Sequence, residues 1–279
     1  MLFNQRIIHS DNGTLEDKSV ELNNIFTATA TLDIALTDDY LYIGSDLPFN
    51  HRYFEVSTAN SVSSIMSVDI WNGSEWNAAV DVIDQTSTGG KTLAQSGYIS
   101  WTTDRNESWG IDETTENVTG LTTLKIYNMY WVRLKVSASL SGTTAVSYVG
   151  HKFANDDDLS GYYPDLVSST IMDAFETSKT NWNEQHFLAA EEIIQDIRRK
   201  RIAWNANQVI DWEQFNLAAI HRVAFNIMAA FGDDYKDNRL EAKKAYDEAM
   251  NLKVFNTDIN ADGHNQISER EPHRGICRT

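Results

Sequence analysis

The stretch KFANDDDLSGYYPDL, residues 152–166, separates two parts of the chain that have different hydrophobic periods. It is acidic and rich in turn-forming residues, which is typical of a linker. Before it, apolar and polar residues alternate as in strands; after it, apolar residues recur at helical spacing. The sequence therefore predicts a β domain over residues 1–150, a linker over 151–166, a helical domain over 167–253 and a tail over 254–279.

The part before the linker consists of short segments rich in β-branched and aromatic residues, separated by turn residues. Asn72-Gly73 lies between two such segments, and this pair favours a tight hairpin because both residues accept a positive φ. Many short strands joined by turns are typical of an antiparallel β-sandwich. The predicted strands are residues 26–32, 40–44, 53–57, 65–71, 76–83, 98–101, 125–136 and 144–149.

Five tryptophans fall in the predicted sandwich, and they allow two interpretations. Trp71, Trp101 and Trp131 occupy alternating positions that face a core, where large aromatic side chains supply much of the burial energy. Trp109 lies among charged residues and Gly110, so it is predicted to be the exposed one. The alternative is that these rings form platforms for binding carbohydrate.

Three longer helices and one short helix are predicted after the linker. The short one lies within residues 167–179, and the first long one begins at Asn181, which forms a capping box with Glu184. The second runs from near Asp211 to Gly232, and its wide apolar face predicts the central helix of the domain. The third covers residues 237–252. Together the two parts predict an α+β chain with a sandwich and a helical bundle.

The first long helix buries a face formed by Phe187, Ala190, Ile194 and Ile197, and it ends in a basic cluster. This cluster comprises Arg198, Arg199, Lys200 and Arg201. One interpretation is contact with DNA phosphates, since arginine binds phosphate well. The other is favourable positive charge at a helix C-terminus.

The tail contains a sequence that resembles the start of a calcium-binding loop. Asp258, Asn260 and Asp262 alternate before Gly263, and Glu269 stands where a bidentate carboxylate belongs. Pro272 opposes the helix that normally follows such a loop, so the alternative is an Asx turn without metal. Calcium is the only cofactor that the sequence suggests. The tail is expected to become ordered on assembly.

The sequence contains no recognisable catalytic motif, and we expect that the protein is not an enzyme. His186 and His221 lie on different predicted helices, and together with the acidic tail they define the alternative of a metal-dependent hydrolase. The three aspartates 156–158 offer oxygen ligands to a hard cation, but such a run is typical of a solvated linker.

Composition narrows the classes of function further. The 279 residues carry a formal charge of -17, which is unlike the basic surface of a gene regulator. No apolar run approaches the length of a membrane span, and the polar start MLFNQR predicts no signal peptide. A lone cysteine, Cys277, fits a reducing compartment such as the cytoplasm.

The helical part resembles the head–tail adaptor proteins of tailed bacteriophages. The segments that carry the resemblance are Trp182–His186, Ala189–Ile194, Trp212, Arg239 and Tyr246–Met250. The sandwich, from Tyr40–Gly44 through Tyr130–Leu134, looks like modules attached to phage neck proteins. The large β domain is a departure from small adaptors, so the layer of the neck to which the chain belongs stays open.

This resemblance implies a structural virion protein without catalytic chemistry. Such adaptors form a ring, commonly of twelve copies, beneath the portal protein; the ring continues the DNA channel and docks tail or neck proteins. A C-terminal extension commonly reaches the portal, which implies portal or tail contact for Arg270, Arg274 and Arg278. The resemblance thus implies assembly in the host cytoplasm, location in the virion neck and no membrane partner. The rival functions are the carbohydrate-binding virion decoration and the hydrolase.

Overall fold

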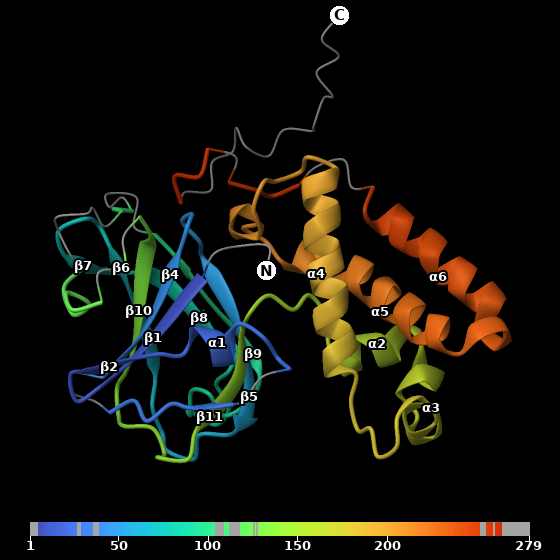
Figure 1. Cartoon of the computed structure of the whole chain (residues 1–279), viewed down its shortest axis with the longest axis horizontal. Coiled ribbons are helices and arrows are strands. Elements are labelled where there is room, and N and C mark those ends of the chain that lie inside the picture. The colour runs from blue at the N-terminus through green and yellow to red at the C-terminus, as the bar shows by residue number, and fades with distance from the viewer. Residues whose placement is uncertain are drawn as a thin grey trace, which may run out of the picture. The chain divides into compact units, whose positions relative to one another are not determined.

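The computed structural model describes residues 5–26, 29–35, 39–103, 109–111, 118–124, 126, 128–251, 255–258 and 260–263. Over these residues the chain is an α+β protein with two antiparallel sheets and six α-helices (Figure 1). The chain divides into two compact units. Residues 5–150 and 258–263 form the first, here called the β unit, and residues 151–257 form the second, the helical unit.

The β unit holds both sheets and one short helix, α1 (Ser19–Leu22). The six-stranded sheet has the order β2-β1-β4-β10-β6-β7, and the five-stranded sheet has the order β3-β11-β5-β9-β8. The strands are β1 (Gln5–Asp11), β2 (Thr14–Asp17), β3 (Ala30–Thr31), β4 (Tyr40–Ser45), β5 (His51–Thr58), β6 (Met66–Trp71), β7 (Trp76–Ala78), β8 (Val80–Asp84), β9 (Gly97–Thr102), β10 (Tyr130–Val136) and β11 (Ala145–Gly150).

Two hairpins of the six-stranded sheet turn at Asn-Gly pairs. The predicted pair Asn72-Gly73 joins β6 to β7, and Gly73 has a φ of 102°. The pair Asn12-Gly13 joins β1 to β2 with φ values of 48° and 78°, the left-handed conformation that a tight hairpin requires. The preference of Asn-Gly pairs for tight turns therefore also explains this first hairpin, which was not predicted from the sequence.

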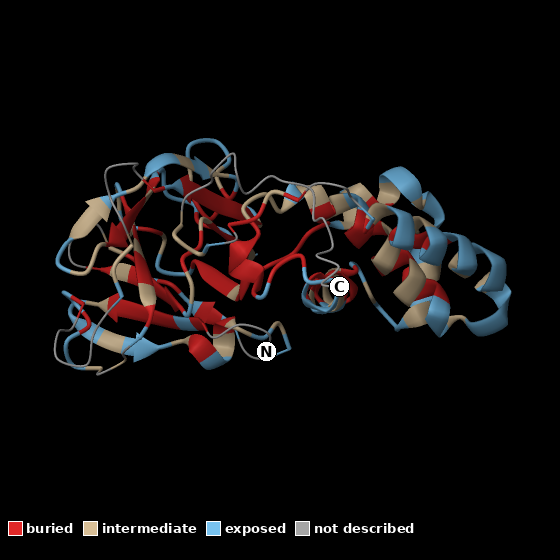
Figure 2. Cartoon of the chain, turned by 90° about the horizontal axis from the view of Figure 1, so that it is seen from above, coloured by how far each residue is buried: buried red, intermediate tan, exposed pale blue. Residues whose placement is uncertain are grey.

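The core of the β unit lies between the sheets, and a second apolar layer covers the other face of the six-stranded sheet. Ile7 belongs to the first and Ile8 to the second, because neighbouring residues of a strand point to opposite faces. The predicted burial of Trp71, Trp101 and Trp131 is confirmed. Figure 2 shows that most strands carry buried residues along much of their length.

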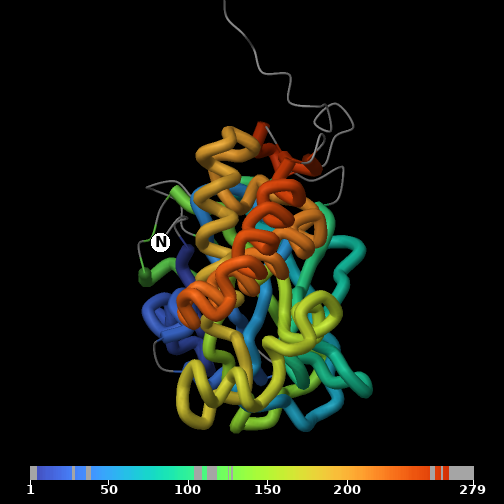
Figure 3. Tube along the Cα trace, turned by 90° about the vertical axis from the view of Figure 1, so that its right-hand side faces the viewer, coloured from blue at the N-terminus to red at the C-terminus, as the bar shows by residue number. Residues whose placement is uncertain are grey.

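The helical unit consists of five α-helices and four short 3-10 turns among the residues described. The α-helices are α2 (Asp156–Tyr162), α3 (Ser169–Phe175), α4 (Asn183–Arg199), α5 (Asn216–Ala230) and α6 (Lys236–Ala249). The 3-10 turns are η1 (Pro164–Val167), η2 (Ala206–Gln208), η3 (Glu213–Phe215) and η4 (Gly232–Tyr235). The predicted central position of α5 is confirmed, because it packs against α2, α4 and α6 (Figure 3).

The segment predicted to be a linker, 151–166, is folded. Its acidic run forms the first turn of α2, where Asn155 and Asp158 make a capping box. Acidic side chains are favourable there because the N-terminus of a helix carries partial positive charge. Phe153 and Leu159 are buried, so this segment contributes to the core of the helical unit.

The predicted capping box of α4 does not form. The helix begins at Asn183, and the residue at its N-cap is Trp182, whose side chain makes no cap. The backbone N–H of Trp182 instead donates to Asp156, and Glu184 pairs with Lys179 at 3.2 Å. The side chain of Asn181 accepts the N–H of Asn183 at 3.1 Å, so a local Asx turn and the contact with Asp156 stand in place of the capping box. Likewise α5 begins at Asn216 rather than near Asp211, because the turn η3 precedes it.

The start of the predicted tail also differs from a free extension. Phe255 is buried and stacks on Phe215, with ring centroids 5.7 Å apart. Thr257 forms a bridge with Val209, and the backbone N–H of Ile210 donates to the carbonyl of Asn256. Residues 255–257 are therefore part of the core of the helical unit.

Candidate functional site

The C-terminal end of α4 has the geometry of a Schellman motif. The N–H of Ile202 donates to the carbonyl of Ile197, and the N–H of Arg201 donates to that of Arg198. The motif places one residue in the left-handed conformation, and that residue is Arg201, with a φ of 59°. Glycine usually occupies this position because a Cβ atom is unfavourable there. Arg201 therefore adopts a conformation that is unfavourable for a residue with a Cβ atom.

The four cations of the cluster have different surroundings. Lys200 donates to the carbonyl of Met250 and so caps the end of α6, while Arg199 pairs with Asp196 at 2.8 Å. Arg198 and Arg201 are exposed, and neither side chain has an ion-pair or hydrogen-bond partner among the described residues. Arg199 and Lys200 therefore have contacts within the protein, whereas the side chains of Arg198 and Arg201 are free to bind a partner.

Trp204 follows this cluster and is the most exposed of the large apolar side chains described, at 79%. Its neighbours are buried: Ile202 and Ala203 before it, and residues 205–209 after it. The side chain of Gln208 accepts the N–H of Trp204, which holds the backbone of the loop. A fixed loop therefore presents a large ring to solvent. The exposure of Trp204 was not predicted from the sequence, because it depends on how the loop packs.

We call Arg198, Arg201 and Trp204 the basic tip of the helical unit. Trp204 lies three residues after Arg201, so their Cα atoms are at most about 11 Å apart. Tryptophan and arginine are the residue types most enriched among the anchors of protein interfaces. The guanidinium groups can equally bind phosphate. The basic tip is the described surface best suited to binding an acidic partner.

His186 and His221 have separate partners. Nε2 of His186 lies 3.0 Å from Asp156, and burial lowers the pKa of this imidazole although the carboxylate opposes the shift. Nδ1 of His221 lies 2.8 Å from the hydroxyl of Tyr163, and burial lowers its pKa. Across the described part of the chain, no group of three His, Cys, Asp or Glu residues could hold a metal. These contacts give both histidines a structural role.

The loop predicted to bind calcium belongs to the β unit and forms hydrogen bonds typical of Asx turns. The carboxylate of Asp258 accepts the N–H groups of Asp262 and Gly263 at 3.2 and 2.8 Å. Asn260 accepts the N–H of Asp262 and donates to its carboxylate. Calcium binding stays a prediction. Glu269 and the predicted portal contacts Arg270, Arg274 and Arg278 lie outside the described residues.

Trp109, predicted to be exposed, is partly buried against the core of the β unit. Its indole N–H donates to Thr103 at 2.9 Å, and its ring lies 5.5 Å from that of Phe49. Gly263 passes so close to this ring that a Cβ atom there would overlap it. The prediction was wrong because residues distant in sequence cover the ring. This packing leaves little of the ring for stacking on a sugar.

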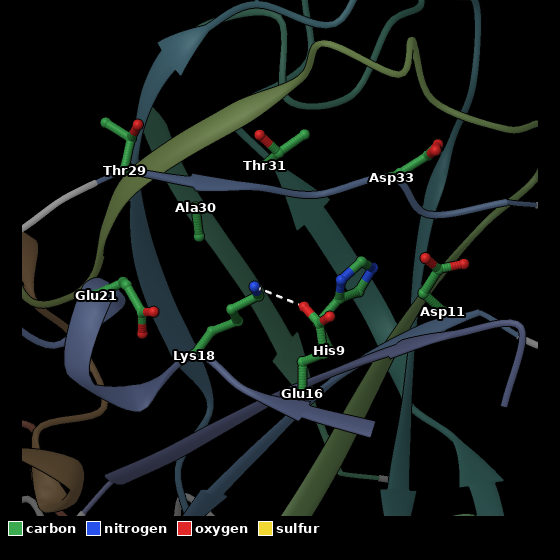
Figure 4. Close-up of a pocket in the computed structure, with 9 residues that line it drawn as sticks. All are labelled: His9, Asp11, Glu16, Lys18, Glu21, Thr29, Ala30, Thr31 and Asp33. Carbon is green, nitrogen blue, oxygen red and sulfur yellow. Dashed lines mark ion pairs between the residues drawn. The ribbon is translucent and has the colours of Figure 1, made fainter. Parts of the chain in front are cut away.

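A polar hollow of about 390 Å³ opens in the β unit between the edges of the two sheets (Figure 4). β2 is an edge of one sheet and β3 an edge of the other. The lining residues are mostly polar and come from β1, β2, α1 and the segment around β3. They are His9, Asp11, Glu16, Lys18, Glu21, Thr29, Ala30, Thr31 and Asp33.

Comparisons with protein families, with curated proteins and with solved structures gave no match. Within the described residues, no helix is both long enough and apolar enough to cross a membrane.

Proposed function

We propose that the chain is a structural subunit of the neck of a tailed bacteriophage. In this proposal the helical unit forms a ring, commonly of twelve copies, beneath the portal protein, and the ring continues the channel through which DNA passes. The observation that carries the proposal is the basic tip. It adds an interaction surface to a set of helices whose sequence resembles that of head–tail adaptors.

The basic tip is suited to a large and permanent assembly. Exposing Trp204 to water forgoes the burial energy of a large apolar ring, so covering it in a complex is favourable. Arg198 and Arg201 add charge that can pair with acidic groups of a neighbouring subunit or of the portal. The chain as a whole, by contrast, has a formal charge of -17. The basic tip is therefore a local exception to the charge of the protein.

The same charge pattern suits passage of DNA. An acidic subunit repels the phosphate backbone over most of its surface, so DNA can move past it without tight binding. Contact of phosphate with Arg198 or Arg201 would be local and dependent on salt. In the proposed ring, therefore, the basic tip contacts the portal or the edge of the channel. The β unit has no catalytic role in this proposal.

The test is attachment of the purified full chain to portal-containing heads of the same particle. Co-sedimentation measures the affinity, and electron microscopy of the heads shows whether a ring forms. We expect Arg198→Ala combined with Trp204→Ala to weaken attachment by tenfold or more, since these are anchor residue types. Lys243→Ala combined with Lys244→Ala, on the exposed face of α6, is the matched control and should change little.

Two outcomes would contradict the proposal. One is a wild-type chain that neither attaches to portal-containing heads nor forms rings on them. The other is equal weakening by the α6 control, which would show that general charge and not the basic tip governs attachment. Raising the salt concentration separates the roles of the residues, because the arginine contribution falls with salt and the Trp204 contribution does not.

A further inference from the structure

We propose that the polar hollow of the β unit binds an organic polyamine. The hollow lies at the side of the sandwich, where the hairpin of β1 and β2 faces the segment around β3 (Figure 4). Its volume of about 390 Å³ falls in the range of small-molecule sites, ~300–1,000 Å³. The proposal concerns a ligand site in the β unit and does not depend on the role of the basic tip.

The charge of the lining selects a cation. Four carboxylates surround the hollow, from Asp11, Glu16, Glu21 and Asp33, against the single ammonium group of Lys18. Lys18 pairs with Glu16 at 2.6 Å, and this hydrogen bond lowers the pKa of Glu16, so Glu16 stays ionised. An anionic ligand would face a net negative lining, whereas an ammonium group would be attracted.

His9 gives an independent indication of a ligand. Its side chain projects from β1 into the hollow, yet the residue is only 3% exposed. Its Nε2 atom is buried and has no hydrogen-bond partner among the residues described. A buried polar atom without a partner costs about 1–3 kcal/mol and calls for an explanation. With the proton on Nδ1, this nitrogen accepts a hydrogen bond, and an ammonium group donates one.

The spacing of the carboxylates indicates an extended cation. They belong to β1, β2, α1 and the segment after β3, and Figure 4 shows them spread around the hollow. A metal ion needs ligands that converge on one point, whereas a polyamine carries several ammonium groups along a chain. Among the described lining residues there is no Trp, Tyr or Phe ring on which a sugar could stack.

Calorimetric titration of the full chain with spermidine, at constant ionic strength, tests the proposal. We expect one-site binding that weakens about tenfold or more in Asp11→Asn combined with Asp33→Asn. Neither residue is fully buried, so this variant should fold. Asp233→Asn combined with Asp234→Asn removes the same charge from the helical unit and should leave the affinity unchanged. Titration with magnesium at the same ionic strength should give no comparable binding.

Nuclear magnetic resonance locates the binding directly. Spermidine should shift the imidazole resonances of His9 and leave those of His221 unchanged. Equal weakening by both double variants, or His9 resonances that do not move, would overturn the proposal, because the attraction would then be to the overall charge. Tighter binding of a tri-lysine peptide than of spermidine would also overturn it, since the occupant would be a protein side chain.

Discussion

Two residues of this chain differ from what their residue types usually do, one in backbone conformation and one in exposure to solvent. Arg201 takes the left-handed conformation at the end of α4, and Trp204 points into solvent from a loop that is otherwise buried. Both belong to the basic tip. At the residue scale, therefore, both departures lie on the surface for which we propose a function.

Replacing Arg201 with glycine should stabilise the protein. Glycine removes the steric cost of the left-handed conformation, so we expect the free energy of unfolding to rise by about 0.5–1 kcal/mol. Urea denaturation measures the change. Arg198→Gly is the matched control, because it places glycine in the last turn of the helix and should destabilise by up to about 1 kcal/mol. A loss of stability in Arg201→Gly as large as in the control would contradict this explanation.

Replacement of two tryptophans should change the stability of the protein by very different amounts. Trp131 is 0% exposed, and a Cβ atom on Gly44 would lie 2.8 Å from its ring. Trp131→Ala should therefore cost about 3–5 kcal/mol of stability, because it leaves a cavity. Trp204→Ala should change stability by less than about 0.5 kcal/mol, since its ring is exposed. Chemical denaturation checks both, and a large loss in Trp204→Ala would mean that the ring is covered within the chain.

At the scale of elements, side chains from one helix cap or anchor another. Lys200 at the end of α4 caps α6, and the hydroxyl of Tyr246 on α6 donates to Asp196 on α4 at 2.6 Å. Asp156 in the first turn of α2 accepts the N–H of Trp182 and bonds to His186. The contacts of Asp156 fix the start of α4, whereas those of Lys200 and Asp196 join α4 to α6.

The pairing of α2 with α4 should make stability depend on pH. Burial lowers the pKa of His186 in the folded protein, so the unfolded chain takes up this proton first. Stability should therefore fall as the pH drops below about 6.5, the ordinary histidine pKa. Burial raises the pKa of Asp156, but the contacts with His186, the N–H of Trp182 and the charge of Lys152 together outweigh burial and leave that pKa lowered, so its contribution is lost at still lower pH.

Urea denaturation between pH 7.5 and 5.5 checks the histidine contribution. We expect wild type to lose more stability than His186→Gln over this range, because glutamine does not titrate. His221→Gln is the comparison variant, since His221 is only half-buried and should contribute less. An identical loss in wild type and in His186→Gln would exclude His186 as the source.

At the scale of the whole molecule, the last described residues complete both units. Residues 255–257 pack in the helical unit, and residues 258–263 belong to the β unit. The chain thus returns to the β unit after completing its helices. The tail begins later than the sequence predicted.

Truncation after Val254 should therefore lower the melting temperature. It removes Phe255 from its stack on Phe215, and it also removes the loop at Gly263 that lies against Trp109. Phe255→Ala alone should cost about 3 kcal/mol or more, because the ring is buried. Calorimetry of both variants checks this, and a truncated protein that melts like wild type would show that these contacts contribute little.

The sequence did not predict β1, β2 or α2, and it predicted one strand over residues 76–83, where β7 and β8 belong to different sheets. The sequence by itself did determine most of the other strands, the buried face of α4 and the central position of α5. Periodicity suffices for these features because it depends only on which residues one element turns toward the core. It also determined the burial of Trp71, Trp101 and Trp131. The Asn72-Gly73 hairpin followed from local backbone preference alone.

Only the tertiary structure decided the features that depend on residues far apart in the chain. Trp109 is covered by a segment near the other end of the sequence, and the first turn of α2 lies where the sequence indicated a linker. The polar hollow exists because the edges of two sheets, formed by separate segments, face each other. Periodicity carries no information on such pairings, since they depend on which elements meet and not on how each one alternates.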